Sequence, residues 1–158
     1  MRWGCARKAV IAGAMALMWA CTMTHQDLAQ QYYSQGRLDQ AEYEIQKALA
    51  AKPDNLAIDH LAARIFTQQG VGRYKRGEMI SAANYFHRAI DYYPTYAPAY
   101  DWLGLTAFAQ HNWQDAVKYG SQGAGFSGQP EPGYVKSARQ ELKKVRSGQP
   151  YVRPRRAQ

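Results

Sequence analysis

A stretch of the chain occurs twice, and this internal repeat constrains the fold more than any other feature of the sequence. The first copy runs from residue 33 to 53 and the second from residue 74 to 94, without a gap, at an offset of 41. A fixed offset of this kind indicates that one structural unit is stacked several times along the chain. Five positions keep the same or a similar residue type in both copies: Gly36/Gly77, Ala41/Ala82, Ile45/Phe86, Ala48/Ala89 and Pro53/Pro94.

The repeated residue types suit a pair of helices joined by a tight turn. Gly36 and Gly77 make the turn between the two helices. Pro53 and Pro94 end the second helix, because proline lacks a backbone donor and disfavours helix at the preceding residue. A third copy continues from residue 100 to Ala116, which follows Ala82 at an offset of 34.

This pattern resembles the tetratricopeptide repeat, in which an aromatic residue, leucine and glycine mark the first helix and two alanines and a proline mark the second. The resemblance implies an all-α, right-handed solenoid of helix–turn–helix units, with about three repeats and a C-terminal capping helix. It places the repeat domain at residues 21–128, with units at about 22–55, 56–96 and 97–128.

Three departures from the pattern carry further predictions. The second unit has seven extra residues, about two helical turns, which lengthen the helix between residues 55 and 75. Gly70 and Gly72 predict a kink in that helix. Gly120 and Gly123 replace core residues in the second helix of the third unit, so we expect that helix to be short or frayed.

The two ends of the chain differ from the repeats. Residues 129–147 predict the capping helix, begun by Pro132, and residues 148–158 predict a basic disordered tail. The body at residues 21–130 is nearly neutral, with nine Lys and Arg against ten Asp and Glu. The positive charge of the chain therefore lies at its ends, with eight basic against two acidic residues from 131 onward, and no nucleic-acid partner is expected.

Residues 1–20 predict a signal peptide, with Arg2, Arg7 and Lys8 before an uncharged stretch too short to span a bilayer permanently. The stretch ends at Cys21 in a pattern that resembles a bacterial lipobox, although Trp19 is bulky where a small residue is preferred. That resemblance implies lipidation of Cys21, and Thr22 after it favours the outer membrane. An ordinary signal peptide, or an uncleaved anchor with an incidental cysteine, is the alternative.

The reactive residues do not predict catalysis. The four histidines, His25, His60, His87 and His111, lie in different parts of the repeat and none pairs with another ligand at metal-binding spacing. Gly70 and Gly72 follow no strand and lack a third glycine, so they do not predict a phosphate-binding loop. The sequence also contains no Gly-x-Ser-x-Gly nucleophile elbow. We therefore expect no enzyme activity, cofactor or metal.

A run of aromatic residues, Tyr92, Tyr93, Tyr96, Tyr100 and Trp102, could be a stacking platform for a ligand. Tyr100 occupies the aromatic core position of the repeat, however, and Tyr92 and Tyr93 end a helix. Packing is the favoured interpretation.

The resemblance also implies a binding surface, because this family lines its concave face with the first helix of each unit. Gln26 and Gln30 stand where the chaperone-binding subclass has the Lys and Asn that grip a peptide carboxylate, so that mode is disfavoured. The groove is mixed polar and aromatic, which suits an extended or helical peptide. Transferred position by position, the lining comprises Gln26, Gln30, Tyr33, Arg64, Thr67, Val71, Tyr74, Asp101, Leu105 and Phe108.

The leading hypothesis is a non-enzymatic adaptor or scaffold of the bacterial envelope, lipid-anchored on the periplasmic side of the outer membrane, or else soluble in the periplasm or secreted. It resembles the repeat lipoproteins that assist pilus or secretion assembly. The alternative is an envelope module that holds an anionic glycan or lipid through its tyrosines and basic tail. Groove binding should largely survive added salt, whereas binding by the tail should not. Because three units are few, a homo-oligomer or a completing partner is also considered.

Overall fold

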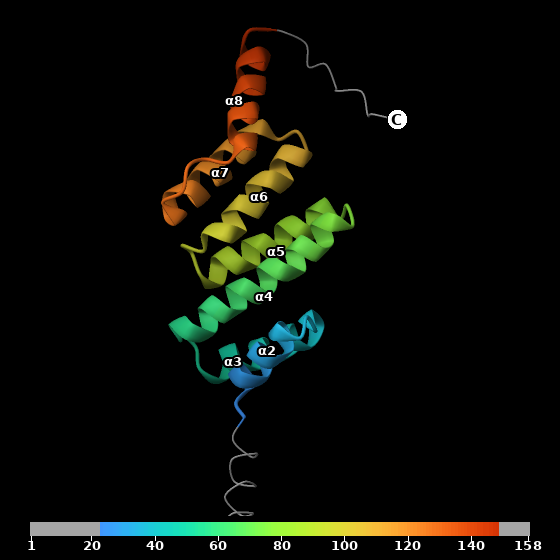
Figure 1. Cartoon of the computed structure of the whole chain (residues 1–158), viewed down its shortest axis with the longest axis vertical. Coiled ribbons are helices and arrows are strands. Elements are labelled where there is room, and N and C mark those ends of the chain that lie inside the picture. The colour runs from blue at the N-terminus through green and yellow to red at the C-terminus, as the bar shows by residue number, and fades with distance from the viewer. Residues whose placement is uncertain (1–22, 149–158) are drawn as a thin grey trace, which may run out of the picture. The chain divides into compact units, whose positions relative to one another are not determined.

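The protein is represented by a computed structural model, which describes residues 23–148. Residues assigned to regular structure in this part of the chain are all helical (Figure 1). The predicted signal peptide, Cys21 and all but the first residue of the predicted tail lie outside the described residues. The helices, labelled as in Figure 1, are α2 (His25–Ser34), α3 (Leu38–Ala51), α4 (Leu56–Lys75), α5 (Met79–Tyr92), α6 (Ala97–Ala109), α7 (Trp113–Ser127) and α8 (Gly133–Arg146).

The described residues divide into two compact units, residues 23–58 and residues 59–148. Unit 1 contains the helix pair α2–α3, whose buried residues are alanines and one isoleucine: Ala29, Ala41, Ile45 and Ala48. Unit 2 contains most of α4 and the four helices after it. Its core is larger and includes Phe66, Phe86 and Leu103. The helices in both units bury their apolar residues against a neighbour, which is the main source of helix stability in proteins.

The repeat seen in the sequence is present in the backbone. Helices α3 and α5 both have 14 residues, and their first and last residues are offset by the same 41 positions. The turn before each contains a glycine with positive φ, 72° at Gly36 and 80° at Gly77. The third turn has the same geometry at His111, where φ is 63°. The prediction that Gly36 and Gly77 form the turns is confirmed.

The extra residues of the second unit lengthen the N-terminal end of α4. Helix α4 has 20 residues and α6 has 13, and their last residues, Lys75 and Ala109, are 34 positions apart. The additional two turns of α4 therefore precede the part that corresponds to α6. His60, on this extension, contacts Tyr93 and Tyr96 edge-on at ring-centroid distances of 5.1 and 5.6 Å. The extension thus packs against the connection that follows α5.

Gly70 has a packing role that its helix-breaking tendency does not reveal. Helix α4 is assigned as a single helix from Leu56 to Lys75, so the glycines do not end it. A Cβ atom at Gly70 would lie 2.5 Å from a ring carbon of Phe86. The glycine allows the phenyl ring of α5 to lie directly on the backbone of α4. Gly104 follows at an offset of 34, at the equivalent position of α6.

Helix α7 contradicts one prediction. It has 15 residues and is neither short nor frayed, despite Gly120 and Gly123 in its interior. Both glycines are buried, and a Cβ atom at Gly120 would collide with Tyr134 and Val135 of α8. Glycine is less favourable than alanine in a helix by about 1 kcal/mol, but packing against the closely approaching α8 offsets this loss of stability. The prediction was wrong because it considered propensity without packing.

Helix α8 covers the end of unit 2. Val135 and Ala138 are fully buried, and the hydroxyl of Tyr134 donates a hydrogen bond to the carbonyl oxygen of Asp101 at 3.1 Å. Just before the helix, Glu131 forms an ion pair with Arg139 from the middle of α8, and its carboxylate also accepts a hydrogen bond from Ser121. The pKa of the Glu131 carboxyl lies below its usual value, mainly because of the hydrogen bond from Arg139 and secondly because of that from Ser121. No helix among the described residues is long and apolar enough to cross a bilayer.

Candidate functional site

The predicted groove residues of unit 1 all lie on α2. Gln26 and Tyr33 are half-buried and Gln30 is exposed. They occupy one helix of ten residues, which begins with a capping box formed by Thr24 and Asp27. The side chain of Thr24 accepts from the Asp27 amide, while the Asp27 carboxylate accepts from the Thr24 amide, so the helix start is firmly fixed.

Two of the predicted groove residues of α4 are buried. Thr67 is 4% exposed and Val71 is 8% exposed, and Val71 packs with Phe86 and Leu103. The Thr67 hydroxyl has no hydrogen-bond partner among the described residues. These two side chains therefore contribute to packing between helices more than to an accessible lining. Arg64, one turn before Thr67, is half-buried.

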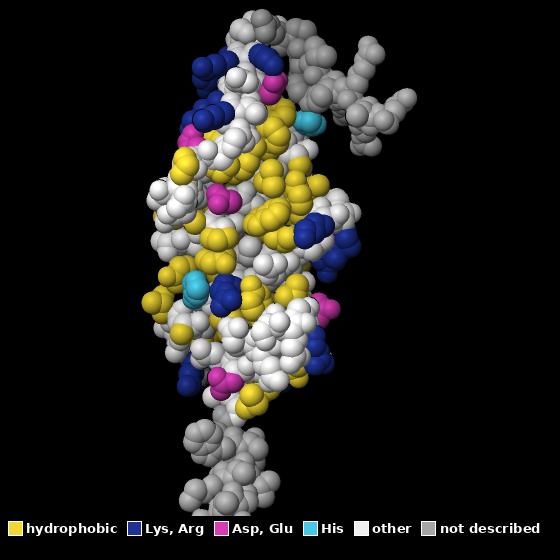
Figure 2. Space-filling model, viewed as in Figure 1, with side chains coloured by type: hydrophobic (Ala, Val, Ile, Leu, Met, Phe, Trp, Pro, Cys, Tyr) yellow, Lys and Arg dark blue, Asp and Glu magenta, His cyan; other side chains and the backbone are white. Residues whose placement is uncertain are grey.

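An aromatic strip runs along α6 and the end of α4. We define it as Tyr74, Trp102, Leu105 and Phe108, all half-buried. Tyr74 of α4 and Trp102 of α6 meet in an edge-to-face contact, with ring centroids 5.5 Å apart at 63°. Beneath them, Trp102 stacks on Phe86 at 6.3 Å. Figure 2 shows hydrophobic side chains gathered over α6 and the adjoining end of α4.

Trp102 is the strip residue that the sequence alone does not assign to this surface. The sequence groups it with the tyrosines before it, but in the structure its ring joins Tyr74. The signal that could have found it is its spacing, since Trp102, Leu105 and Phe108 follow one another at intervals of three. Side chains three or four positions apart share one face of a helix.

Phe108 is more deeply embedded than the repeat pattern indicates. Its ring lies 5.2 Å from that of Trp113 and 5.9 Å from that of Tyr134, centroid to centroid. It also packs against a small core of Ala107, Ala116 and Ala138. Phe108 therefore forms the end of the strip, where it contacts α8. Its side chain is partly exposed and also packs against the core.

Asp101 is oriented toward α7 and away from open solvent. One carboxylate oxygen, Oδ1, is buried without a hydrogen-bond partner among the described residues, and it lies where a Cβ atom at Gly123 would be. Burial raises the pKa of the Asp101 carboxyl above its usual value. Burial is also the main cause of the raised pKa of Tyr134, and the nearby Asp101 charge adds to it.

The tyrosines that could have formed a ligand platform are used in packing. Tyr92 stacks on Phe66 at 5.4 Å, and Tyr100 lies 5.1 Å from Phe126. The Tyr100 hydroxyl donates a hydrogen bond to the carbonyl oxygen of Pro94 at 2.9 Å. These contacts support the packing interpretation of the aromatic run.

Glu78 is a group whose acidity is perturbed by a local ion pair. Glu78 accepts hydrogen bonds from Arg76 at 2.8 Å and Arg73 at 2.9 Å, which together lower the pKa of its carboxyl. In residues 23–148, no three His, Cys, Asp or Glu side chains lie together in a way that could hold a metal ion.

The comparisons with known proteins concern the fold. No protein-family description matches the chain, and no curated protein matches it. Among solved structures it is similar to the Sgt2 TPR domain from Aspergillus fumigatus, with 16% identity, a TM-score of 0.48 and coverage of 85% of this chain and 88% of that one.

Two further structures show similar values. The first TPR of Spaghetti (RPAP3), bound to the HSP90 peptide SRMEEVD, is 20% identical with a TM-score of 0.45, covering 78% of this chain and 89% of that one. MamA protein is 17% identical with a TM-score of 0.42, and the match covers 82% of this chain and 96% of that one. The fold is all-α and of the tetratricopeptide-repeat type. In this chain the assignment follows from the helix pairs and from turns of one geometry at offsets of 41 and 34.

Proposed function

We propose that the protein is a non-enzymatic interaction adaptor that binds a peptide or partner protein along the aromatic strip. The observation that carries the proposal is the contact of Tyr74 with Trp102, in which two half-buried rings from different helices form one apolar surface. Large aromatic side chains supply much of the free energy at protein interfaces, especially when they are already held in place. Trp102 is held by stacking on Phe86, which supports this role.

The shape and chemistry of the strip favour a peptide or a partner helix. Three of its four residues lie on α6, and Tyr74 comes from the last turn of α4, which also carries Arg73 and Lys75. An extended or helical segment can place apolar anchors at regular intervals against such a surface. No nucleic-acid partner is part of the proposal.

We further propose that the adaptor acts in the bacterial envelope, tethered by a lipid on Cys21 to the periplasmic side of the outer membrane. The support is the sequence alone: a basic and then apolar stretch that ends in cysteine, followed by threonine. A tether of this kind would confine the binding surface to the neighbourhood of envelope assemblies. A soluble periplasmic or secreted form is the competing arrangement.

Site-specific photo-cross-linking in native membranes tests the binding surface even though the partner is unidentified. A benzoylphenylalanine replaces Leu105 in the strip or, as the matched control, Tyr43, which is 59% exposed on α3. We expect a distinct protein adduct from position 105 that is weak or missing from position 43. The same adducts from both positions, or none from position 105, would contradict the proposed surface.

A further inference from the structure

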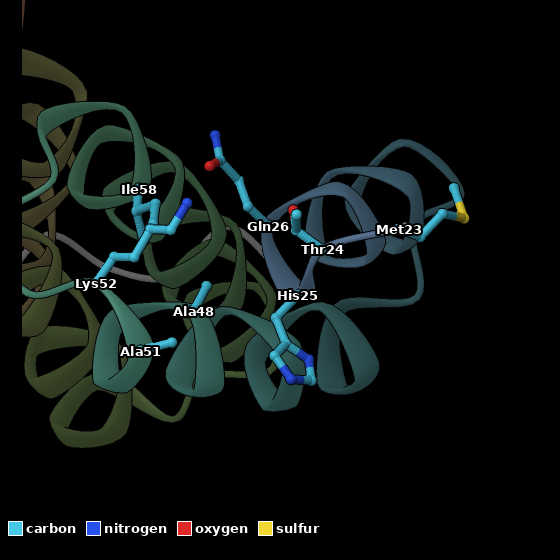
Figure 3. Close-up of a pocket in the computed structure, with 8 residues that line it drawn as sticks. All are labelled: Met23, Thr24, His25, Gln26, Ala48, Ala51, Lys52 and Ile58. Carbon is cyan, nitrogen blue, oxygen red and sulfur yellow. The ribbon is translucent and has the colours of Figure 1, made fainter. Parts of the chain in front are cut away.

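Unit 1 contains a cavity of about 160 Å³ between the start of α2 and the end of α3. Its walls include Thr24 and His25 from the start of α2, Ala48, Ala51 and Lys52 from the end of α3, and Ile58. Figure 3 shows the two alanines directed toward the space between Ile58 and Gln26, while the His25 ring is turned away from it. The cavity is large enough for several water molecules, but much of its floor is apolar.

The other two repeats fill the equivalent place with a pair of aromatic rings. In the second repeat, Phe66 of the first helix and Tyr92 of the second are stacked at 5.4 Å. In the third, Tyr100 and Phe126 take the same positions at an offset of 34 and lie 5.1 Å apart. Distances of about 4.5–7 Å between ring centroids are typical of favourable aromatic pairs. The pair is thus a regular element of this chain's repeat.

The first repeat lacks this pair. At the offset of 41, the counterparts of Phe66 and Tyr92 are His25 and Ala51. Ala51 has only a methyl group where a ring would be, and the imidazole of His25 is engaged elsewhere. Its Nδ1 lies 2.6 Å from Oε2 of Glu44, and its side chain is 47% exposed. The cavity is therefore the place of an aromatic pair that this repeat does not supply itself.

We propose that this cavity binds an aromatic side chain of a partner protein, which completes the packing that the other repeats achieve internally. The guest ring would lie on Ala48 and Ala51 and against Ile58. The exposed Lys52 at the rim adds a cation that is attracted to the face of an electron-rich ring, so tyrosine or tryptophan fits better than leucine. The lining residues of this site all belong to unit 1, whereas the residues of the aromatic strip all belong to unit 2.

An NMR titration of the isotope-labelled full chain with N-acetyltyrosine amide tests the proposal, with N-acetylleucine amide as the comparison probe. We expect the tyrosine probe to shift amide signals of residues 24–26 and 48–52, and the leucine probe to bind more weakly. Ala51→Tyr supplies the missing ring from the chain itself and should weaken binding of the tyrosine probe by about tenfold or more. Ala50→Tyr, on the neighbouring exposed residue outside the cavity, should leave binding unchanged.

The melting temperatures of the two variants complete the test. Because Ala51→Tyr fills a cavity, it should melt at a higher temperature than Ala50→Tyr. A lower melting temperature for Ala51→Tyr would show that the space cannot hold a ring, and would overturn the proposal. Equal binding of the two probes, equal affinity in the two variants, or signal shifts outside residues 23–58 would overturn it as well.

Discussion

Glycine is the residue whose role in this protein depends most on its surroundings. Gly120 and Gly125 lie on the same helix, α7, and have the same intrinsic cost of helix formation. Gly120 is buried beneath Tyr134 and Val135 of α8, whereas no atom would lie within 4 Å of a Cβ at Gly125. At the residue scale, the first glycine creates a helix contact and the second only weakens a helix.

This contrast predicts opposite effects of one substitution. Gly120→Ala should lower the free energy of unfolding by about 1–3 kcal/mol, because the new methyl group overpacks the contact with α8. Gly125→Ala should raise it by about 0.5–1 kcal/mol, because alanine favours helix and meets no neighbour. Urea denaturation of both variants measures the difference. A gain in stability for Gly120→Ala would show that α8 does not approach α7 this closely.

The partly buried carboxylate of Asp101 predicts a pH-dependent loss of stability. Its pKa is raised by burial, so the native state holds this proton to higher pH than the unfolded chain does. Ionisation at pH 7 therefore destabilises the fold, and the cost disappears as the pH falls below the unfolded value. Asp101→Asn should stabilise the protein at pH 7 and make little difference below about pH 4. Unfolding free energies measured across this range provide the test, with the exposed Asp91→Asn as control. If the difference in unfolding free energy between Asp101→Asn and the unmodified protein did not change with pH, the raised pKa of Asp101 would be contradicted.

At the scale of elements, α8 is the helix that covers the C-terminal end of unit 2. Tyr134 lies against Gly104 of α6 and Gly120 of α7, and Val135 also lies against Gly120. Ala138 packs with Ala107 of α6 and Ala116 of α7. Stacked repeats need a final helix with one polar side, because the last repeat has no neighbour to cover it. The last turn of α8 accordingly carries Lys143, Lys144 and Arg146.

Removing α8 should therefore expose apolar surface. Deleting residues 131–158 should lower the unfolding free energy by about 3 kcal/mol or more, because burial of a valine-sized or larger side chain contributes about 1.5–3 kcal/mol. Deleting only residues 149–158 should leave thermal stability unchanged. Circular dichroism melts of the two truncated chains distinguish these effects. Equal melting temperatures would mean that α8 does not stabilise unit 2.

The sequence predicted those elements whose residues have a local signature. The glycine turns at residues 36 and 77 repeat at one offset, and the structure places them as predicted. Prediction from the sequence failed where the role of a residue depends on a neighbour that is distant in the chain. Gly120 looks like a helix breaker until Tyr134 is placed beside it. Likewise, the resemblance to the repeat family implies that Val71 lines a groove, but its packing against Phe86 and Leu103 shows that it is buried.

At the scale of the whole molecule, the lipid anchor is the first property to test. If Cys21 carries the lipid, Cys21→Ser should abolish labelling by a fatty-acid probe and move the protein from the membrane to the soluble envelope fraction. Cys5→Ser should change the labelling little, since Cys5 lies within the predicted signal peptide. Unchanged labelling of the Cys21→Ser variant would remove the anchor from the account.

The most direct measurement of the central claim is the affinity of the partner cross-linked at position 105 for the Tyr74→Ala variant. Tyr74 is half-buried at the strip and is not one of the fully buried core residues, so its removal should leave the helical circular-dichroism signal intact. Loss of an aromatic anchor commonly costs about 2 kcal/mol, so we predict a roughly thirtyfold higher dissociation constant. Tyr43→Ala, a matched change on α3, should bind as the unmodified protein does. Full affinity of Tyr74→Ala, together with lost affinity when residues 149–158 are deleted, would contradict the account and assign binding to the basic tail.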